Sequence, residues 1–120
     1  EKFDIILNLE IVEHVDNLDL YLQSCYDLLK KNGIMFTATI NRTFVSYIKA
    51  IVGAEYILKW LPIGTHDWQK FIKPNELITI CKKNSLNLKA ADGISYNPIL
   101  DKWNISKDKS VNYITKYKKN

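Results

Sequence analysis

The sequence predicts an α/β domain whose sheet is at least partly parallel. Two strand-like runs, residues 3–9 and 34–40, flank a helical pattern over residues 17–31. This strand–helix–strand order is typical of parallel strands joined by a right-handed crossover. The chain has 120 residues, of which 47% are hydrophobic and 25% charged, with only 4 glycines and 3 prolines. That composition favours one packed domain over a linker or a disordered tail.

The first strand and helix follow from local patterns. Residues 3–9, FDIILNL, form a short apolar run typical of a strand buried on both faces of a parallel sheet. Asp16 or Asn17 is the expected N-cap of the helix. Lys30 and Lys31 are expected in the last helical turn, and Gly33 as the left-handed residue that ends the helix. The apolar positions at helical spacing are Leu18, Leu22, Cys25 and Leu29, with Tyr21 and Leu28 beside them.

The second half of the chain adds helices and then strands. Residues 44–61 form an apolar helical pattern that Pro62 ends, and a loop over residues 63–68 follows. Pro74 opens another helix over residues 74–84, whose apolar face carries Leu77, Ile78, Cys81 and Leu86. The remainder indicates two or three strands that close the sheet as an antiparallel hairpin. These runs are residues 86–91, 93–96 and 111–117, with a turn at Asn97 and Pro98.

Composition excludes several classes of protein. Cys25 and Cys81 are too few and too far apart for a disulfide framework or a zinc site, and we expect both to be small buried side chains. No apolar run is long enough to cross a membrane, and residues 1–4 have no signal-like character. The net charge of +4 is concentrated in the last third of the chain, and by itself it does not indicate a nucleic-acid partner.

Four segments carry a specific resemblance, and they occur in a characteristic order and spacing. They are FDIILNLEIVEHV at 3–15, LLKKNGIMFTATINR at 28–42, AIVGAEYILKWLPIGTHDWQKFIKP at 50–74, and GISYNP at 93–98 followed by VNY at 111–113. Together they resemble the ubiquinone-biosynthesis O-methyltransferase family, also called 3-demethylubiquinone 3-O-methyltransferase. The resemblance implies transfer of a methyl group from S-adenosylmethionine to a catechol hydroxyl of a polyprenylated ubiquinone precursor.

The resemblance also implies which part of the fold is present. It indicates the carboxyl-terminal half of a class I S-adenosylmethionine-dependent methyltransferase, which has a Rossmann-like fold. The family's glycine-rich turn and ribose-binding acid have no counterpart here, because the four glycines are scattered singly. We therefore expect residues 1–120 to be a partial methyltransferase domain that lacks the amino-terminal cofactor-binding half. In that order the strand at 3–9 lacks one neighbour and exposes an apolar edge.

Candidate site residues follow this first strand directly. Glu10, Glu13 and His14 lie at the carboxyl edge of the sheet, where open α/β folds bind ligands. If the backbone turns helically there, the spacing places all three on one side, and they can hold a hard divalent ion such as Mg²⁺. The alternative is that the acids stabilise a helix dipole and His14 packs or caps. The resemblance implies the metal role, and for Leu9 it implies backbone contact with S-adenosylmethionine.

Other expectations concern the substrate and the cell. His66 and Asp67 can orient a phenol or accept a proton, although a hydrogen-bonded pair that orders the loop explains them more simply. Residues 44–61 can lie in a bilayer interface, where a polyprenyl substrate resides, or can be sandwiched within the fold. We expect a cytoplasmic protein that is peripheral on the inner face of the membrane. The alternative function is a non-catalytic remnant or a split-gene fragment acting only with an amino-terminal partner.

Overall fold

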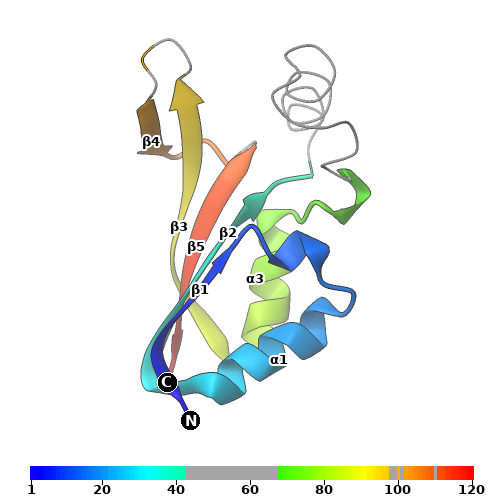
Figure 1. Cartoon of the computed structure of the whole chain (residues 1–120), viewed down its shortest axis with the longest axis vertical. Helices are drawn as coiled ribbons and strands as arrows, with labels where there is room; N and C mark the ends of the chain where they lie inside the picture. The colour runs from blue at the N-terminus through cyan, green and yellow to red at the C-terminus, as the bar shows by residue number, and fades with distance from the viewer. Residues whose placement is uncertain (43–67, 98–99, 101, 110) are drawn as a thin grey trace.

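The computed structural model describes residues 1–42, 68–97, 100, 102–109 and 111–120. These residues form a mixed sheet with two α-helices and two short 3-10 helices (Figure 1). The predicted helix at 44–61 and the loop residues 63–67, with His66 and Asp67, lie outside the described residues. In chain order the elements are β1 Phe3–Leu9, η1 Val12–His14, α1 Leu18–Leu28, β2 Leu29–Ile40, η3 Trp68–Lys70, α3 Pro74–Lys83, β3 Leu86–Asn97, β4 Lys102–Ser106 and β5 Asn112–Lys119.

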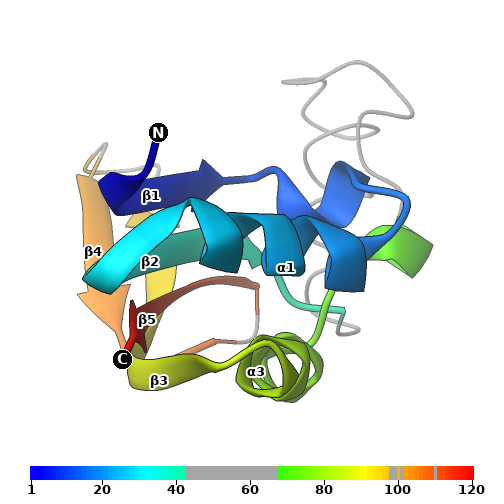
Figure 2. The same ribbon diagram turned by 90° about the horizontal axis from the view of Figure 1, so that it is seen from below.

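The sheet has the predicted parallel pair and the predicted antiparallel closure. Its strand order is β1-β2-β5-β3-β4, and β1 pairs with β2 in parallel. Strand β5 lies antiparallel between β2 and β3, and β4 pairs antiparallel with β3. Helices α1 and α3 lie on the same side of the sheet (Figure 2). The predicted βαβ unit at the start of the chain is therefore confirmed.

Helix α1 begins as predicted but ends earlier. The backbone N–H of Leu20 donates to Asn17 Oδ1 at 3.0 Å, so Asn17 is the cap. The prediction that the helix continues to residue 31 is wrong, because residues 29–33 belong to β2. The left-handed residue is Asn32, with φ of 65°, rather than Gly33. Gly33 is instead required by close packing, since a Cβ there would lie 2.8 Å from the carbonyl oxygen of Lys30.

Three carboxyl-terminal strands are described, within the predicted two or three, and β3 and β5 are longer than predicted. Strand β3 runs without the predicted break near Asp92, although its register with β5 shifts between Leu88 and Ala90. Gly93 lies inside β3, where the backbone of Asp108 passes very close. A Cβ at this position would overlap that backbone, so the position requires glycine. Strand β4 was not predicted, although its sequence KWNIS alternates polar and apolar residues, because the run has only 5 residues. The strand predicted over 111–117 is β5, at residues 112–119.

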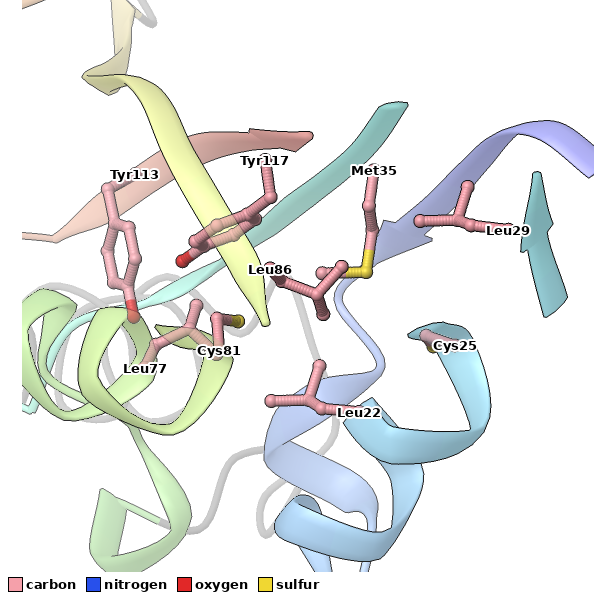
Figure 3. Close-up of a cluster of buried hydrophobic side chains, with 9 residues drawn as sticks. All are labelled: Leu22, Cys25, Leu29, Met35, Leu77, Cys81, Leu86, Tyr113 and Tyr117. Carbon is pink, nitrogen blue, oxygen red and sulfur yellow. The ribbon is translucent and has the colours of Figure 1, made fainter. Parts of the chain in front are cut away.

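The main hydrophobic core lies between the sheet and the two helices (Figure 3). Leu22, Cys25, Leu77 and Cys81 of the predicted helical faces contribute to it, whereas Leu28 is exposed. Leu29 and Leu86, also predicted on these faces, enter the core from β2 and β3 instead. Both cysteines are free and buried, as predicted, and burial raises the pKa of the Cys81 thiol to about 12. The buried cluster consists of Leu22, Cys25, Leu29, Met35, Leu77, Cys81, Leu86, Tyr113 and Tyr117.

Strand β1 is an edge strand with one exposed apolar face. Phe3, Ile5, Leu7 and Leu9 are exposed, whereas Asn8 on the opposite face is buried. The prediction that the strand at residues 3–9 is buried on both faces is therefore wrong. The prediction that this strand exposes an apolar edge is confirmed. Among the described residues, α1 and α3 pack on one face of the sheet only, and no strand pairs with the outer edge of β1. An uncovered apolar edge of this kind recruits other chains.

Candidate functional site

The carboxyl ends of β1 and β2 lie side by side because the two strands are parallel. Leu9 is the last residue of β1 and pairs with Ala38 of β2. The next residue, Glu10, has a left-handed φ of 54°, and its N–H donates to the carbonyl oxygen of Ala38 at 2.8 Å. This bond keeps the chain beside β2 for one more residue before it turns into η1. The turn places residues 10–14 over the end of β2.

Glu13 is the best-anchored of the predicted site residues. It lies in η1 and is buried. The Thr39 hydroxyl near the end of β2 donates to Glu13 Oε2 at 2.5 Å. On the other side of the carboxylate, Glu13 Oε1 lies 3.8 Å from Nε2 of His14, whose side chain is exposed. The hydrogen bond from Thr39 holds the carboxyl group of Glu13 in one orientation at the edge of the sheet.

The three predicted metal ligands are only partly brought together. Glu13 and His14 are adjacent, but Glu10 is exposed and precedes the 3-10 turn in a left-handed conformation. The expected helical turn from Glu10 therefore does not form. In the described part of the chain, no three His, Cys, Asp or Glu side chains gather around one point. Mg²⁺ commonly uses one or two carboxylates and completes its shell with water and substrate oxygens, so the donor types fit and the metal role stays a prediction.

A buried polar network below the site was not predicted. The Tyr21 hydroxyl donates to Asn8 Oδ1 at 2.6 Å, and Asn8 Nδ2 donates to Thr37 Oγ1 at 3.5 Å. Burial raises the pKa of Tyr21. The available signal was the presence of Asn8 and Thr37 inside apolar strands, where a polar side chain needs a partner. The network joins the amino-terminal half of α1 to the carboxyl-terminal halves of β1 and β2.

Two residues just after β2, Asn41 and Arg42, were also not predicted to lie near the site. Asn41 is buried, and its side chain donates from Nδ2 to the carbonyl oxygen of Lys109 at 2.8 Å. Arg42 Nη2 forms an ion pair with Glu76 Oε2 at 2.9 Å, which links the end of β2 to the first turn of α3. Burial opposes ionisation of Glu76, but hydrogen bonds from Lys73 and Arg42 hold its pKa below the usual value. The available signal was the polar pair Asn41 and Arg42, which follows the apolar strand run directly.

The fold is that of part of a class I methyltransferase. A possible histamine N-methyltransferase from Thermotoga maritima, described as S-adenosylmethionine-dependent, superimposes with a TM-score of 0.68 at 15% identity, covering 100% of this chain and 57% of that one. The N-methyltransferase NodS from Bradyrhizobium japonicum, solved with S-adenosylhomocysteine, gives a TM-score of 0.58 at 10% identity, covering 99% and 47%. At these identities the likeness establishes the fold alone.

The sequence comparisons define the family. Residues 1–91 match the model of the methyltransferase domain family, and the chain belongs to it. It is 62% identical over 120 residues to a ubiquinone biosynthesis O-methyltransferase of Pelagibacter ubique, covering 100% of this chain and 50% of that protein. The same-named protein of Bartonella bacilliformis is 58% identical over 114 residues, covering 95% and 46%. The resemblance is confirmed, and the chain spans about half the length of these relatives.

Proposed function

We propose that the protein to which this chain contributes transfers a methyl group from S-adenosylmethionine to a catechol hydroxyl of a polyprenylated ubiquinone precursor. The observation that carries this proposal is 62% identity, over the whole chain, to a protein named for O-methylation in ubiquinone biosynthesis. The ordered carboxyl edge of β1 and β2 supports it, since open α/β sheets bind ligands at this edge. In the reaction the catechol oxygen attacks the sulfonium methyl carbon and the carbon–sulfur bond breaks. S-adenosylhomocysteine leaves, and the catechol proton is released.

In this proposal the described residues supply the acceptor side of the site. The backbone at Leu9 contacts S-adenosylmethionine, and the glycine-rich turn that would hold the rest of the cofactor belongs to an amino-terminal half. Glu10, Glu13 and His14 are the residues that would hold Mg²⁺, which when bound would lower the pKa of a catechol oxygen. The Thr39 hydroxyl keeps Glu13 oriented at the edge of the sheet. Leu7 and its exposed neighbours on β1 pack against the amino-terminal half.

Membrane association belongs to the same proposal. A polyprenyl substrate is dissolved in the bilayer, and residues 44–61 are an apolar segment with tyrosine, tryptophan and lysine, side chains that favour an interface. The protein is then cytoplasmic and peripheral on the inner face of the membrane. No helix in the described ranges is long and apolar enough to cross a membrane. Replacing Ile51, Ile57 and Trp60 with Ser should lower liposome flotation without lowering the melting temperature, and unchanged flotation would remove this part of the proposal.

A second candidate function is a split-gene fragment that acts only with an amino-terminal partner. The exposed apolar face of β1 is a surface that such a partner would cover. The two candidates differ in whether the amino-terminal half is encoded in the same reading frame. The DNA directly upstream decides this. An in-frame glycine-rich motif supports the enzyme in one chain, and a stop codon supports the fragment.

Complementation in cells tests the proposed activity. The chain is joined to the amino-terminal half of the Pelagibacter relative and expressed in a bacterial strain that lacks its ubiquinone biosynthesis O-methyltransferase. We expect ubiquinone to return, measured by chromatography of lipid extracts. The control is the same fusion with Glu13→Ala, which we expect to restore much less. A stable, soluble fusion that restores no ubiquinone would contradict the proposal.

A further inference from the structure

Asn41 ends a row of buried polar side chains on the helix-facing side of β2. Thr37 and Thr39 lie at alternate positions of this strand, and Asn41 continues the alternation one residue beyond its end. Their exposed fractions are 0%, 1% and 9%. Thr37 Oγ1 accepts from Asn8, and Thr39 Oγ1 donates to Glu13. The row therefore runs from the core toward the edge where the candidate site lies.

The orientation of the Asn41 amide is fixed by its surroundings. Nδ2 donates to the carbonyl oxygen of Lys109 at 2.8 Å, and the backbone N–H donates to the carbonyl oxygen of Val111 at 2.6 Å. A carbonyl oxygen only accepts hydrogen bonds, so the side-chain nitrogen must face Lys109 and the side-chain oxygen must face away. If the amide were flipped so that its oxygen and nitrogen exchanged places, Asn41 Oδ1 would face the carbonyl oxygen of Lys109, and the two acceptors would repel each other.

The side-chain oxygen of Asn41 is a buried acceptor without a donor. Oδ1 has no hydrogen-bond partner in the part of the chain that the structure describes. A buried polar atom left unpaired is destabilising, so its presence calls for an explanation. The Tyr117 hydroxyl is a different case, because it points into the hydrophobic core toward Cys81, whose thiol interacts with it (Figure 3). Asn41 differs because it lies at the carboxyl end of a strand in a parallel pair, where ligands bind.

We propose that Asn41 Oδ1 is a substrate-binding group that accepts a hydrogen bond from the catechol hydroxyl that is not methylated. This inference rests on the proposed function. A catechol has two neighbouring hydroxyls, of which one gives up its proton and receives the methyl group. The other keeps its O–H and needs an acceptor when it enters a dry site. A neutral amide oxygen provides that acceptor, and it distinguishes a hydroxyl from an ether, which has no proton to donate.

The test compares two ligands on the full-length fusion with the amino-terminal half of the Pelagibacter relative. One is a catechol with a short prenyl chain, and the other is its analogue with a methoxy group in place of the hydroxyl that is not methylated. Equilibrium binding is measured with S-adenosylhomocysteine present. We expect the wild-type fusion to bind the catechol roughly 10-fold or more tightly than the analogue, because the analogue leaves a buried acceptor unpaired. Asn41→Leu should reduce this preference to about twofold or less, if no other group accepts a hydrogen bond from the hydroxyl.

Control variants separate recognition from folding. Asn41→Asp keeps an acceptor oxygen but loses the side-chain N–H that donates to the carbonyl oxygen of Lys109. We therefore expect this variant to have a lower melting temperature and to retain the preference for the hydroxyl. Thr115→Val removes another buried polar group, one whose hydroxyl donates to the carbonyl oxygen of Thr37, and it should also leave the preference unchanged. Both variants are checked by thermal unfolding alongside Asn41→Leu.

Three results would overturn the inference, and each points to a different cause. If the wild-type fusion binds the catechol and the analogue equally, no group of the protein recognises this hydroxyl by a hydrogen bond. This conclusion holds whether or not Asn41→Leu folds. If a folded Asn41→Leu variant keeps the full preference, another residue accepts the hydrogen bond from this hydroxyl. If the fusion binds S-adenosylhomocysteine but neither phenol, the proposed function fails and the role of Asn41 fails with it.

Discussion

The hydroxyl of Thr39 donates to the carboxylate of Glu13 at 2.5 Å, across 26 residues of sequence. Both side chains are buried, so this bond fixes η1 against the end of β2. It also limits the freedom of Glu13 to move toward a ligand. Any role of Glu13 in binding or catalysis therefore depends on Thr39.

Replacing Thr39 with Val should destabilise the protein. The change keeps the shape of the side chain but leaves a buried carboxylate without its donor, which costs about 1–3 kcal/mol in the free energy of unfolding. Urea denaturation of the full-length fusion measures this loss. Thr39→Ser keeps the hydroxyl and should recover most of the stability. Equal stability of the Val and Ser variants would show that the bond contributes nothing.

Removing the proposed metal ligands should weaken the binding of a divalent ion by the fusion. We expect Glu13→Gln to lower the affinity for Mn²⁺, used as a spectroscopic probe for Mg²⁺, because the variant keeps the side-chain shape and removes its charge. Glu10→Gln should lower it as well if Glu10 moves toward Glu13 when the ion binds. Asp27→Asn, a change of an exposed acid on α1, is the control. Unchanged Mn²⁺ binding in both glutamate variants would show that neither glutamate holds the ion.

Asp19 makes stability depend on pH in the acid range. Asn84 Nδ2 donates to Asp19 Oδ1 at 2.8 Å and Lys83 lies 3.2 Å from Oδ2. The hydrogen bonds from Asn84 and Lys83 lower the pKa of Asp19 below its ordinary value of 3.8. Because the pKa is lower in the folded state, the contribution to stability is complete above the ordinary value. It is lost as the pH falls through the pKa of the folded state.

The corresponding variant is Asp19→Asn, measured by urea denaturation at several pH values. We expect it to be less stable than the wild type at pH 7, and the difference should shrink as the solution is acidified below the ordinary pKa of the group. Asp27→Asn should show a much smaller difference at pH 7. A difference between wild type and Asp19→Asn that is constant over this range would show that the ionised carboxylate is not what stabilises the contact between α1 and α3.

The exposed face of β1 should make the isolated chain self-associate. Ile5, Leu7 and Leu9 are 58%, 59% and 56% exposed on one strand. We expect dimers, aggregates or partial folding in size-exclusion chromatography with light scattering. Adding the amino-terminal half in trans should restore a soluble complex. Leu7→Lys should reduce the self-association, since a charge on an edge strand opposes pairing. A monodisperse monomer with cooperative thermal unfolding would show that the edge is already covered.

The sequence predicts the parts of the fold that depend on local patterns. The parallel pair around α1, the cap at Asn17 and the buried positions Leu22, Leu77 and Cys81 all follow from periodicity and capping rules. The end of α1 does not, because the segment LKKNG resembles a helix terminus. Only its long-range pairing shows that Leu29 lies opposite Phe3 in the sheet.

The candidate site was harder to predict than the fold. Its position after β1 follows from the topology, and the choice of Glu10, Glu13 and His14 followed from spacing. That spacing argument assumed a helical turn, whereas Glu10 is left-handed and only Glu13 and His14 come together. The bond to Thr39 and the unpaired oxygen of Asn41 depend on contacts between distant segments. Such contacts have no local signature beyond polar residues at the end of an apolar strand.

The transfer of a labelled methyl group tests the central claim most directly. The purified fusion of this chain with the amino-terminal half of the Pelagibacter relative is incubated with S-adenosylmethionine carrying a ¹³C methyl group and with a short-chain prenyl catechol. The account predicts a monomethyl ether with the label on one catechol oxygen, and much less product with Glu13→Ala. If the folded fusion binds S-adenosylmethionine and the catechol but forms no labelled ether, the account is contradicted.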